Sequence, residues 1–477
     1  MNEQTTPKSR QRWYLWVIPI VLLVAAAAAG VWWFVLRPPK QPNIVLISLE
    51  SVRADHLGCY GYERPTSPAL DALAEESVVY DDAHAVTSWT LPTHASLFTG
   101  LYPNAHQVIG SLGRLDKSYT TLAEILTEYG YHCGGVISGP YLREAHGLNQ
   151  GFAWYDEATS SPSQALAHTE VTCPRMEAGL QNFLTRIRER WRPFFLFAYF
   201  WDPHYDYIPP APYDRMFVTE ECESLDVTNY EQGGAVTEGI TPGQLAYVIS
   251  QYDGEIRWTD DHLQRFFRLL KREGLWDDTA IIVLSDHGEE FFEHHAKGHK
   301  NNLYTESIRI PLIMKYPGGR PRGRNGRLVS QVDLFPTVLE LAGASGDEVH
   351  QGHSLLQPAR PANQPIYFDL THTRYSPKRG GGWQPHYIRH WLGVRQADYA
   401  LIHLVEDQAT ELYHVSEDPG QRVNLFPAEA PRAGELMALI RQSQEQNQAL
   451  ARVLEASGEA ELSEEALKTL RALGYLK

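Results

Sequence analysis

The sequence predicts an α/β fold, in which helices sandwich a mostly parallel sheet and a smaller C-terminal subdomain carries an antiparallel sheet. Two observations predict it. Short continuous apolar runs, typical of strands buried on both faces of a sheet, alternate with longer helical patterns in the order of βαβ units. Near the C-terminus, strand-like runs then follow one another with no helix between them. A chain of 477 residues is long enough for both parts.

The N-terminal segment predicts a membrane anchor. Residues 13–36 form an apolar run without a charge, long enough to cross a bilayer as a helix, and basic residues precede it. We therefore expect a cytoplasmic tail over 1–12, a single transmembrane helix over 13–36 and a linker over 37–41. The body of the protein would then be extracytoplasmic, in the periplasm or outside the cell. A cleaved signal peptide is the alternative.

The large domain is expected over residues 42–345. Its predicted buried strands are Asn43 to Leu49, His132 to Ser138, Phe194 to Phe200, Ala280 to Ser285 and Pro311 to Lys315. Its predicted helices are Pro68 to Glu76, Tyr119 to Tyr129, Cys173 to Trp191 and Pro242 to Glu273. The segment from Tyr205 to Gly243 is rich in Pro, Gly, Tyr and acidic residues, which predicts a loop insertion near the mouth of the site.

The C-terminal subdomain is expected over residues 346–477. A polar stretch containing Pro and Gly, Ser345 to Gln364, marks the junction. Leu436 to Leu454 has the pattern of a covering helix. The predicted antiparallel strands are Pro365 to Leu370, Leu392 to Gln396, Tyr399 to Leu404 and Glu411 to Val415.

Charge and cysteine content limit the function classes. The formal net charge of −16 argues against a nucleic-acid partner. The four cysteines lack the paired spacing of a zinc or redox motif. Cys173 and Cys222 are equally compatible with a disulfide and with buried free thiols.

Four residues carry the most chemistry. Glu50 follows the first predicted strand, Asp286 and His287 follow a later one, and Thr90 opens a short predicted helix. Ligands of parallel sheets gather at the carboxyl ends of the strands, so these side chains are expected to converge. Two carboxylates, an imidazole and a hydroxyl suit a divalent metal, which would lower the pKa of the hydroxyl and ready it for attack.

Several motifs give the chain a resemblance to the sulfatase family of the alkaline phosphatase superfamily. They begin with Arg53-Ala54-Asp55-His56-Leu57-Gly58 and end with Leu412-Tyr413-His414 and Asp418-Pro419-Gly420. Between them stand Ser88-Trp89-Thr90-Leu91-Pro92-Thr93-His94, Trp201-Asp202-Pro203-His204, Ser285-Asp286-His287-Gly288, Gly298-His299-Lys300 and Arg309-Ile310-Pro311.

The resemblance implies a role for each matching position. Glu50 would be the first metal ligand, Ser51 would replace a frequent second aspartate, and Asp286 with His287 would be the late ligand pair. Thr90 would be the nucleophile and a further metal ligand. The other catalytic positions would be His94, which replaces an arginine, His204, which would contact the ester, and His299 or Lys300, which would bind substrate.

Thr90 is the informative departure from the family pattern. Sulfatases mature a cysteine or serine here into formylglycine, and oxidation of threonine would give a ketone, so no formylglycine is expected. Glu50, Thr90, Asp286 and His287 instead resemble the site of lipoteichoic acid synthases and phosphoethanolamine transferases. A threonine sulfate has no elimination route, whereas water or an alcohol can attack a phosphothreonine.

The sequence therefore predicts a membrane-anchored hydrolase or transferase that cleaves phosphate mono- or diesters through a Thr90 intermediate. One divalent metal ion, Mn, Zn, Ca or Mg, is the expected cofactor. A small-molecule, lipid or glycan ester is the expected substrate. Two alternatives stay open: a sulfuric ester hydrolase that works without formylglycine, and a degenerate sulfatase-like binding protein.

Two other polar stretches have competing interpretations. Asp55 and His56 are expected to form a structural turn. The run that contains Glu289, Glu293, His294 and His295 favours a solvated loop over a second metal site.

Overall fold

The structure is a computed structural model that describes residues 18, 20, 21, 41–158, 160, 171–231, 233–344, 349–377 and 383–454. The predicted tail and nearly all of the predicted anchor, 13–36, lie outside these residues. Among the described helices, none has both the length and the apolar character needed to cross a membrane. The anchor and the extracytoplasmic location stay predictions.

The main sheet has eight strands in the order β10-β2-β9-β6-β1-β5-β3-β4. All neighbouring pairs are parallel except the two that β9 makes with β2 and β6. The prediction of a mostly parallel sheet is confirmed. The strands are β1 (Asn43–Leu49), β2 (Val78–His84), β3 (His132–Ile137), β4 (Trp154–Asp156), β5 (Phe194–Phe200), β6 (Thr279–Ser285), β9 (Arg309–Lys315) and β10 (Gly323–Ser330).

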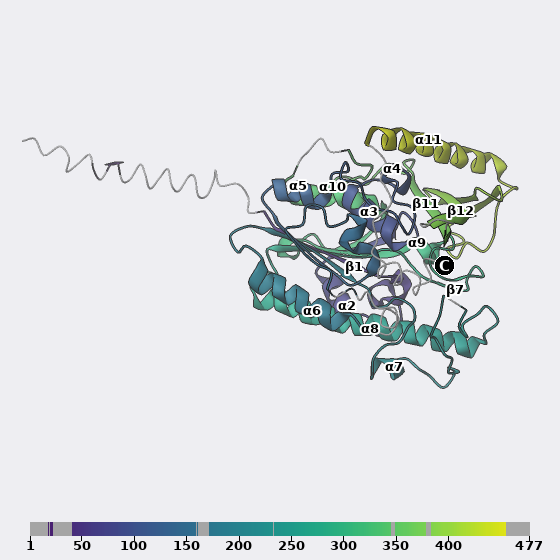
Figure 1. The fold of residues 1–477 in the computed structure, drawn as a ribbon, viewed down its shortest axis with the longest axis horizontal. Coiled ribbons are helices and arrows are strands. Elements are labelled where there is room, and N and C mark those ends of the chain that lie inside the picture. Colours follow the sequence, from purple (N-terminus) through teal and green to yellow (C-terminus); the bar gives the residue numbers. More distant parts are fainter. Residues whose placement is uncertain are drawn as a thin grey trace, which may run out of the picture. The chain divides into compact units, whose positions relative to one another are not determined.

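Helices cover both faces of this sheet (Figure 1). Successive side chains of β1 point to opposite faces of the sheet, and both faces are apolar: Ile44 and Leu46 belong to one buried cluster, and Val45 and Ile47 belong to the other. Both faces must therefore be covered by helices. One face carries α3 (Thr90–Thr99), α4 (Pro103–His106), α5 (Leu122–Glu128) and α10 (Leu334–Leu341); the other carries α2 (Pro68–Glu75), α6 (Cys173–Asn182) and α8 (Pro242–Arg272).

The C-terminal strands form a separate antiparallel sheet in the order β11-β12-β13-β14. One face packs into the main core through residues such as Phe368 and Ile402, and the other packs its Leu401 and Leu412 against Leu436 of α11. These elements are β11 (Ile366–Pro377), β12 (Trp383–Gln396), β13 (Tyr399–Leu404), β14 (Ala409–His414) and α11 (Ala430–Leu454). The predicted small sheet and its covering helix are confirmed.

Shorter elements complete the order. A π-helical turn, η6 (Phe183–Ile187), continues α6, so the predicted helix to Trp191 ends four residues early. The predicted loop insertion contains one helical turn, α7 (Tyr213–Met216). The other short elements are α9 (Thr305–Ile308), a two-stranded ribbon of β7 (Glu290–Phe291) and β8 (Lys297–Gly298), and several 3₁₀ turns.

Two features bear on domain organisation. The described residues from Pro42 onward form one compact unit, and the predicted division near residue 345 stays a prediction. Cys173 and Cys222 are both free thiols, so the structure favours free thiols over a disulfide between them. Cys173 is buried at the start of α6, and Cys222 is half-buried in the insertion.

Candidate active site

The candidate site lies at the carboxyl ends of β1 and β6, where the parallel sheet predicts it. Glu50 directly follows β1 and is fully buried. The next residue, Ser51, has a positive φ of 54°, which turns the chain so that its N–H donates to Asp286 Oδ1 at 3.0 Å. This turn joins the end of β1 to the end of β6.

Thr90 is the first residue of α3, so its hydroxyl stands at the positive end of a ten-residue helix. Pro92 fits the first helical turn because no intrahelical partner exists there for its missing N–H. The Thr90 hydroxyl Oγ1 lies 3.3 Å from Glu50 Oε2 and 3.3 Å from His287 Nε2. The helix therefore places the hydroxyl beside two of the predicted metal ligands, Glu50 and His287.

Asp286 and His287 follow β6 and are fully buried. His287 Nδ1 lies 2.9 Å from the carbonyl oxygen of Gly288, which can only accept a hydrogen bond, so Nδ1 carries a proton and Nε2 is the nitrogen that faces the site. When His287 is neutral, Nε2 has the lone pair that a metal ion needs. Gly288 is required here, because a Cβ on it would lie 1.9 Å from the Glu306 carbonyl oxygen. The Asp-His-Gly motif thus orients an imidazole.

The donor set fits a divalent cation. His287 Nε2 lies 3.3 Å from Glu50 Oε1 and 3.5 Å from Asp286 Oδ2, and Asp286 Oδ2 is buried without a hydrogen-bond partner. Ligand atoms held about 2.0–2.1 Å from one tetrahedral ion are about 3.3 Å apart. Two buried carboxylates, one imidazole and one hydroxyl suit zinc or manganese.

The charges of the site also favour a cation. Burial raises the pKa of Asp286 well above its usual range, and the neighbouring Glu50 carboxylate raises it further. Burial lowers the pKa of His287, but Asp286 and Glu50 outweigh it and raise that pKa to about 9. Two carboxylates so close in the interior are stable only when positive charge is shared between them. A metal ion would supply it.

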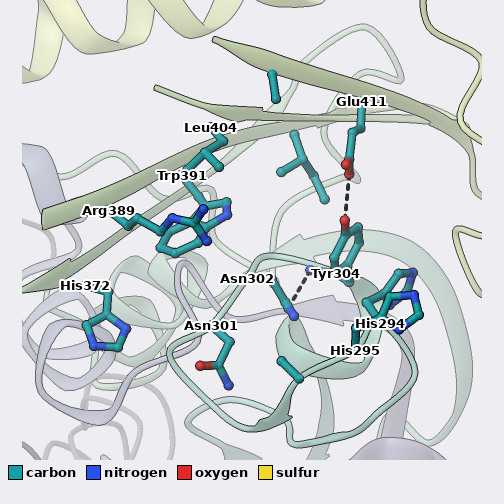
Figure 2. Close-up of a pocket in the computed structure, with 13 residues that line it drawn as sticks. His294, His295, Asn301, Asn302, Tyr304, His372, Arg389, Trp391, Leu404 and Glu411 are labelled. Carbon is teal, nitrogen blue, oxygen red and sulfur yellow. Dashed lines mark hydrogen bonds between the residues drawn. The ribbon is translucent and has the colours of Figure 1, made fainter. Parts of the chain in front are cut away.

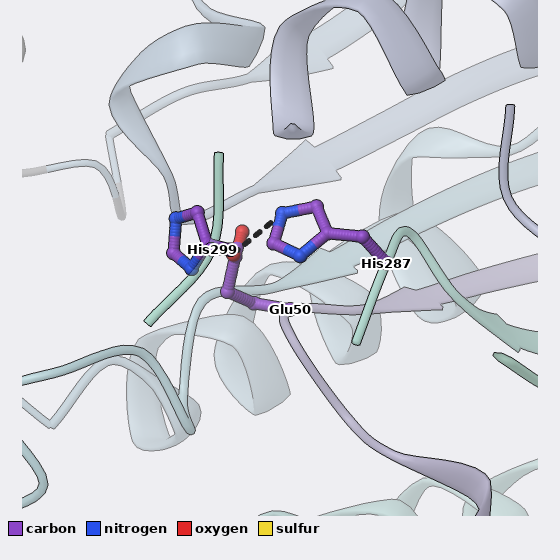
Figure 3. Close-up of side chains that lie close together, drawn as sticks. All are labelled: Glu50, His287 and His299. Carbon is purple, nitrogen blue, oxygen red and sulfur yellow. Dashed lines mark ion pairs between the residues drawn. The ribbon is translucent and has the colours of Figure 1, made fainter. Parts of the chain in front are cut away.

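His299 belongs with these residues. One ligand atom each of Glu50, His287 and His299 lies within 4.8 Å of the others, and Figure 3 shows the three side chains together. The His299 ring is buried, with Nδ1 3.2 Å from Glu289 Oε1 and Nε2 3.5 Å from the Tyr205 hydroxyl. Burial lowers the pKa of His299 well below its usual value, and His287 lowers it further.

His204 and Lys300 border the same space. The His204 ring stacks on Trp201 at a centroid distance of 3.8 Å and lies 5.3 Å from the His299 ring. Lys300 Nζ donates to Glu231 Oε1 at 3.1 Å, and burial lowers the pKa of its ammonium group. Because Glu231 belongs to the insertion, that insertion does reach the site, as the sequence predicts.

His94 is the predicted site residue that the structure places apart. It lies one turn into α3, with Nδ1 2.8 Å from the Thr90 carbonyl oxygen and Nε2 2.9 Å from Ser48 Oγ. Burial lowers its pKa to about 4. Both ring nitrogens are used inside the core, so His94 tethers the start of α3 to β1.

The polar run after the site is mostly ordered. Glu289 and Glu290 are buried, whereas the His295 side chain is 85% exposed. The predicted solvated loop is therefore found only at the tip of this run. Glu290, His294 and Glu306 form a second cluster of possible ligands. Backbone amides of residues 294 and 296 already donate to Glu290, and His294 Nδ1 lies 2.6 Å from Glu306 Oε1.

The stretch after Glu50 is a structural turn in this fold. Asp55 accepts a bidentate pair of hydrogen bonds from Arg53, and His56 Nδ1 lies 2.7 Å from Asp253 Oδ1. Neither side chain contacts the residues of the candidate site.

The sequence prediction missed two residues that hold the ligands. The Tyr199 hydroxyl, from β5, donates to Glu50 Oε2, and Glu289 orients His299. The signal for Tyr199 was present, because a tyrosine inside a buried apolar strand needs a partner for its hydroxyl. Glu289 gave no comparable signal among its polar neighbours.

A polar cavity of about 460 Å³ adjoins the loop that carries His299 and Lys300. Figure 2 shows Arg389, Trp391 and His372 on one side and Tyr304 on the other. His372 Nδ1 lies 3.0 Å from the Lys300 carbonyl oxygen, which ties this cavity to the candidate site.

Comparison with known proteins decides the family. The family described as sulfatase matches residues 42–344. The chain belongs to the sulfatase family. A second family, described as N-sulphoglucosamine sulphohydrolase, C-terminal, matches residues 293–449 of this sulfatase-family chain. Sulfatase-family members are ester hydrolases, and they typically bind a divalent metal.

Individual relatives agree with this assignment. An N-acetylglucosamine-6-O-sulfatase of Bacteroides thetaiotaomicron is 22% identical, and the alignment covers 85% of this chain and 87% of the relative. The multifunctional alkaline phosphatase superfamily protein PehA of Trinickia caryophylli is 28% identical over 66% of this chain and 76% of its own. Among solved structures, a phosphonate monoester hydrolase of Agrobacterium radiobacter has a TM-score of 0.67 at 21% identity, covering 85% of this chain and 96% of that one, which supports the fold.

Proposed function

We propose that this sulfatase-family protein is a divalent-metal-dependent hydrolase or transferase of phosphate mono- or diesters, with an unmodified Thr90 as its nucleophile. One observation carries the proposal: Thr90 Oγ1 lies 3.3 Å from Glu50 Oε2 and 3.3 Å from His287 Nε2, at the first position of α3. A hydroxyl held between a carboxylate and an imidazole is placed for nucleophilic attack.

Glu50, Asp286, His287 and Thr90 would hold the metal, and His299 offers a further nitrogen. When bound, the ion would lower the pKa of the Thr90 hydroxyl and stabilise negative charge on the phosphoryl oxygens. The unpartnered Asp286 Oδ2 supports this ligand set.

The residues themselves suggest a two-step reaction. In the first step the bond from Thr90 Oγ1 to phosphorus forms while the bond from phosphorus to the ester oxygen breaks. The Thr90 hydroxyl donates toward Glu50 Oε2, and burial raises the pKa of Glu50, but His287 outweighs it and lowers that pKa, so Glu50 would only relay the Thr90 proton to solvent. The leaving oxygen takes a proton from the rim of the site. In the second step water or an acceptor alcohol attacks phosphorus and loses its proton, while the bond from phosphorus to Thr90 Oγ1 breaks and Thr90 Oγ1 takes up a proton.

Three side chains at the rim would complete the site. His204, His299 and Lys300 would donate hydrogen bonds to the phosphoryl oxygens and to the leaving oxygen. His299 and Lys300 both belong to the loop after β8, so a single segment would present both groups. The cavity beside this loop, lined by Arg389, Trp391 and Tyr304, would hold the organic part of the ester.

The preference for phosphate over sulfate rests on chemistry at Thr90. Formylglycine can expel sulfate from a geminal diol, but a threonine ester has no second hydroxyl on the same carbon. A sulfated Thr90 would therefore be trapped, whereas a phosphorylated Thr90 can be released by direct attack at phosphorus.

The relatives named sulfatases support a second candidate, a sulfuric ester hydrolase in which water attacks the ester directly. Paired assays separate the two. We expect the protein to turn over an aryl phosphate or aryl phosphonate ester, and Thr90→Ala to abolish that turnover. Turnover of an aryl sulfate that survives Thr90→Ala would favour the second candidate.

The proposed location follows from the sequence of residues 13–36, whose apolar run would anchor the protein in a membrane with its N-terminus in the cytoplasm. The described unit, which begins at Pro42, would then stand outside the cytoplasm. Fractionation of cells that express the full-length chain tests whether the protein is anchored in the membrane. Protease added to the outer face tests whether the described unit lies outside the cytoplasm.

A further inference from the structure

The amino ends of the parallel strands carry a basic and aromatic surface that the reaction does not use. We call it the basal patch and define it by Arg186, Arg190, Trp191 and Tyr129. We propose that the basal patch rests on an anionic lipid bilayer and orients the protein with its candidate active site facing away from that bilayer.

Trp191 is the first observation. Its side chain is 80% exposed, more than any other large apolar residue among the described part of the chain, and Tyr129 nearby is 36% exposed. The guanidinium of Arg192 lies 5.6 Å from the Trp191 ring centroid. An exposed tryptophan beside cations is the side-chain combination that favours the headgroup region of a bilayer.

Charge is the second observation. The segment from Arg186 to Arg192 has four arginines and one acid, Glu189, in a chain whose net charge is −16. Arg188 and Arg192 donate to backbone carbonyls of Leu184 and Gly130, which fixes the segment against the fold. Arg186 and Arg190 are exposed and form no ion pair with a described residue. A local positive surface on an acidic protein suits anionic lipid.

Acidic groups also stand at this edge of the sheet. Arg192 Nη1 lies 3.7 Å from Glu189 Oε2, and Glu273 at the end of α8 acts on Arg188. Lys271 in the last turn of α8 has its Nζ 3.9 Å from Glu76 Oε1, and Asp277 and Asp278 follow α8 directly before β6. The positive charge of the basal patch therefore comes from the segment from Arg186 to Arg192 itself.

Position is the third observation. Hydrogen bonds join this segment to the start of the sheet: His132 N donates to the Pro193 carbonyl oxygen at 2.9 Å, and Phe194 N donates to the side-chain oxygen Oδ1 of Asn43 at 3.3 Å. Pro42, where the chain enters the described unit, receives a hydrogen bond from the Tyr131 hydroxyl. The apolar run 13–36 therefore ends only a few residues before the edge that carries the basal patch.

The orientation has a consequence for the substrate. Glu50 lies at the other end of β1, and seven strand residues span about 20 Å. With the basal patch on the bilayer, the site would open toward water at least that far from the membrane surface. The ester would then come from the aqueous phase and not from a lipid headgroup of the same bilayer. This consequence rests on the proposed function, whereas the basal patch does not.

The test places the full-length chain in lipid nanodiscs that contain an anionic phospholipid, either plain or with bromine near the headgroups, which quenches tryptophans lying in that region. The difference between wild type and Trp191→Phe isolates the fluorescence of Trp191 from that of the other eleven tryptophans. We expect brominated discs to lower this difference at least twofold relative to plain discs.

The paired variant Arg186→Gln/Arg190→Gln should restore most of the Trp191 fluorescence in brominated discs. The matched control is Arg215→Gln in α7, whose side chain is 89% exposed on the insertion, and it should leave the quenching unchanged. Equal Trp191 fluorescence in plain and brominated discs would overturn the proposal, as would a chain that does not co-elute with the discs. Co-elution without quenching would show that the anchor binds the bilayer but that the basal patch does not rest on it. Turnover of a soluble ester tests the proposed function separately.

Discussion

Thr90 Oγ1 and His287 Nε2 lie 3.3 Å apart, although 197 residues separate them in the chain. The start of α3 supplies the first atom and the end of β6 the second. Because His287 Nδ1 is held by a carbonyl oxygen, its other nitrogen is aimed at the Thr90 hydroxyl. This pair, closed by Glu50, is the core of the proposed mechanism, and the predictions below test its parts.

Thr90→Ala should reduce turnover of a phosphate ester at least about 10³-fold, because the attacking oxygen is lost. Thr90→Ser should retain activity, since it keeps the hydroxyl. Thr99→Ala, at the far end of the same helix, is the control: its buried hydroxyl bonds the Ala95 carbonyl oxygen, so its loss should affect stability and not chemistry. Steady-state kinetics with an aryl phosphate measures all three.

Asp286→Asn should stabilise the metal-free protein, because it removes one of the two buried carboxylates that share His287 and leaves that imidazole to balance Glu50 alone. It should also abolish the rise in Tm on adding metal. For wild type, a metal at 100 times its Kd should add about 2.7 kcal/mol. Thermal unfolding with and without Zn²⁺ or Mn²⁺ measures this.

The control for that experiment is Asp253→Asn. Asp253 is equally buried but is paired with His56 and Arg64 away from the site. This variant should lose stability and keep its response to metal. A metal-dependent rise in Tm that survives Asp286→Asn at full size would contradict the assigned ligand set.

Gly288→Ala should lower the free energy of unfolding by about 1–3 kcal/mol, because its new Cβ would meet the Glu306 carbonyl oxygen at 1.9 Å. Activity should fall further than stability, since the same backbone carries His287. Gly434→Ala in α11 is the control, as nothing lies within 4 Å of its Cβ position, and there alanine should stabilise by up to about 1 kcal/mol. Urea denaturation followed by activity assays compares them; an unaffected Gly288→Ala protein would be the contrary result.

Acid should destabilise the fold through two buried histidines. Burial lowers the pKa of His106 to about 3 and that of His146 to about 4, against about 6.5 in the unfolded chain. Between pH 6.5 and 4 the native state therefore binds fewer protons than the unfolded state. Each residue should remove about 1.4 kcal/mol of stability per pH unit as the pH falls through this window.

His146→Gln tests this pH dependence. An amide can still donate to the Gly113 carbonyl oxygen, the partner of His146 Nδ1, but it does not titrate. In this variant the unfolding free energy should depend less steeply on pH, because the unfolded state no longer takes up a proton at residue 146. Urea titrations in the presence of a chelator, which removes any effect of metal release, measure it, and an unchanged slope would refute the assignment.

The fold could be predicted where the sequence pattern was strong. The bounds of β1 and β5 match the predicted runs, because strands buried on both faces are apolar throughout. The strands β2, β4 and β10 were not predicted. For β10 the reason is its place at the sheet edge, where only its last two residues are buried, so burial leaves no apolar pattern in most of it. The reversed direction of β9 depends on pairing, which a one-dimensional pattern does not encode.

The residues of the candidate site also divide into those that the sequence pattern predicts and those that only the three-dimensional structure shows. Glu50, Asp286 and His287 could be predicted, because each directly follows a strand and the parallel sheet brings such ends together. His94 shows the limit of residue matching: its position in the motif suggested a catalytic role, but its ring lies within the core between Thr90 and Ser48. Tyr199 was hidden inside an apolar strand, where only a three-dimensional structure shows which ligand its hydroxyl meets.

The most direct test of the central claim is peptide mass mapping of the metal-loaded protein, quenched in acid during turnover of an aryl phosphate. The account predicts a phosphoryl group on the peptide that contains Thr90, absent before substrate is added and lost again once substrate is exhausted. Because phosphoryl and sulfuryl adducts have nearly the same mass, each ester is supplied in a separate reaction. Sustained turnover with no modified Thr90, together with full activity of Thr90→Ala, would contradict the claim.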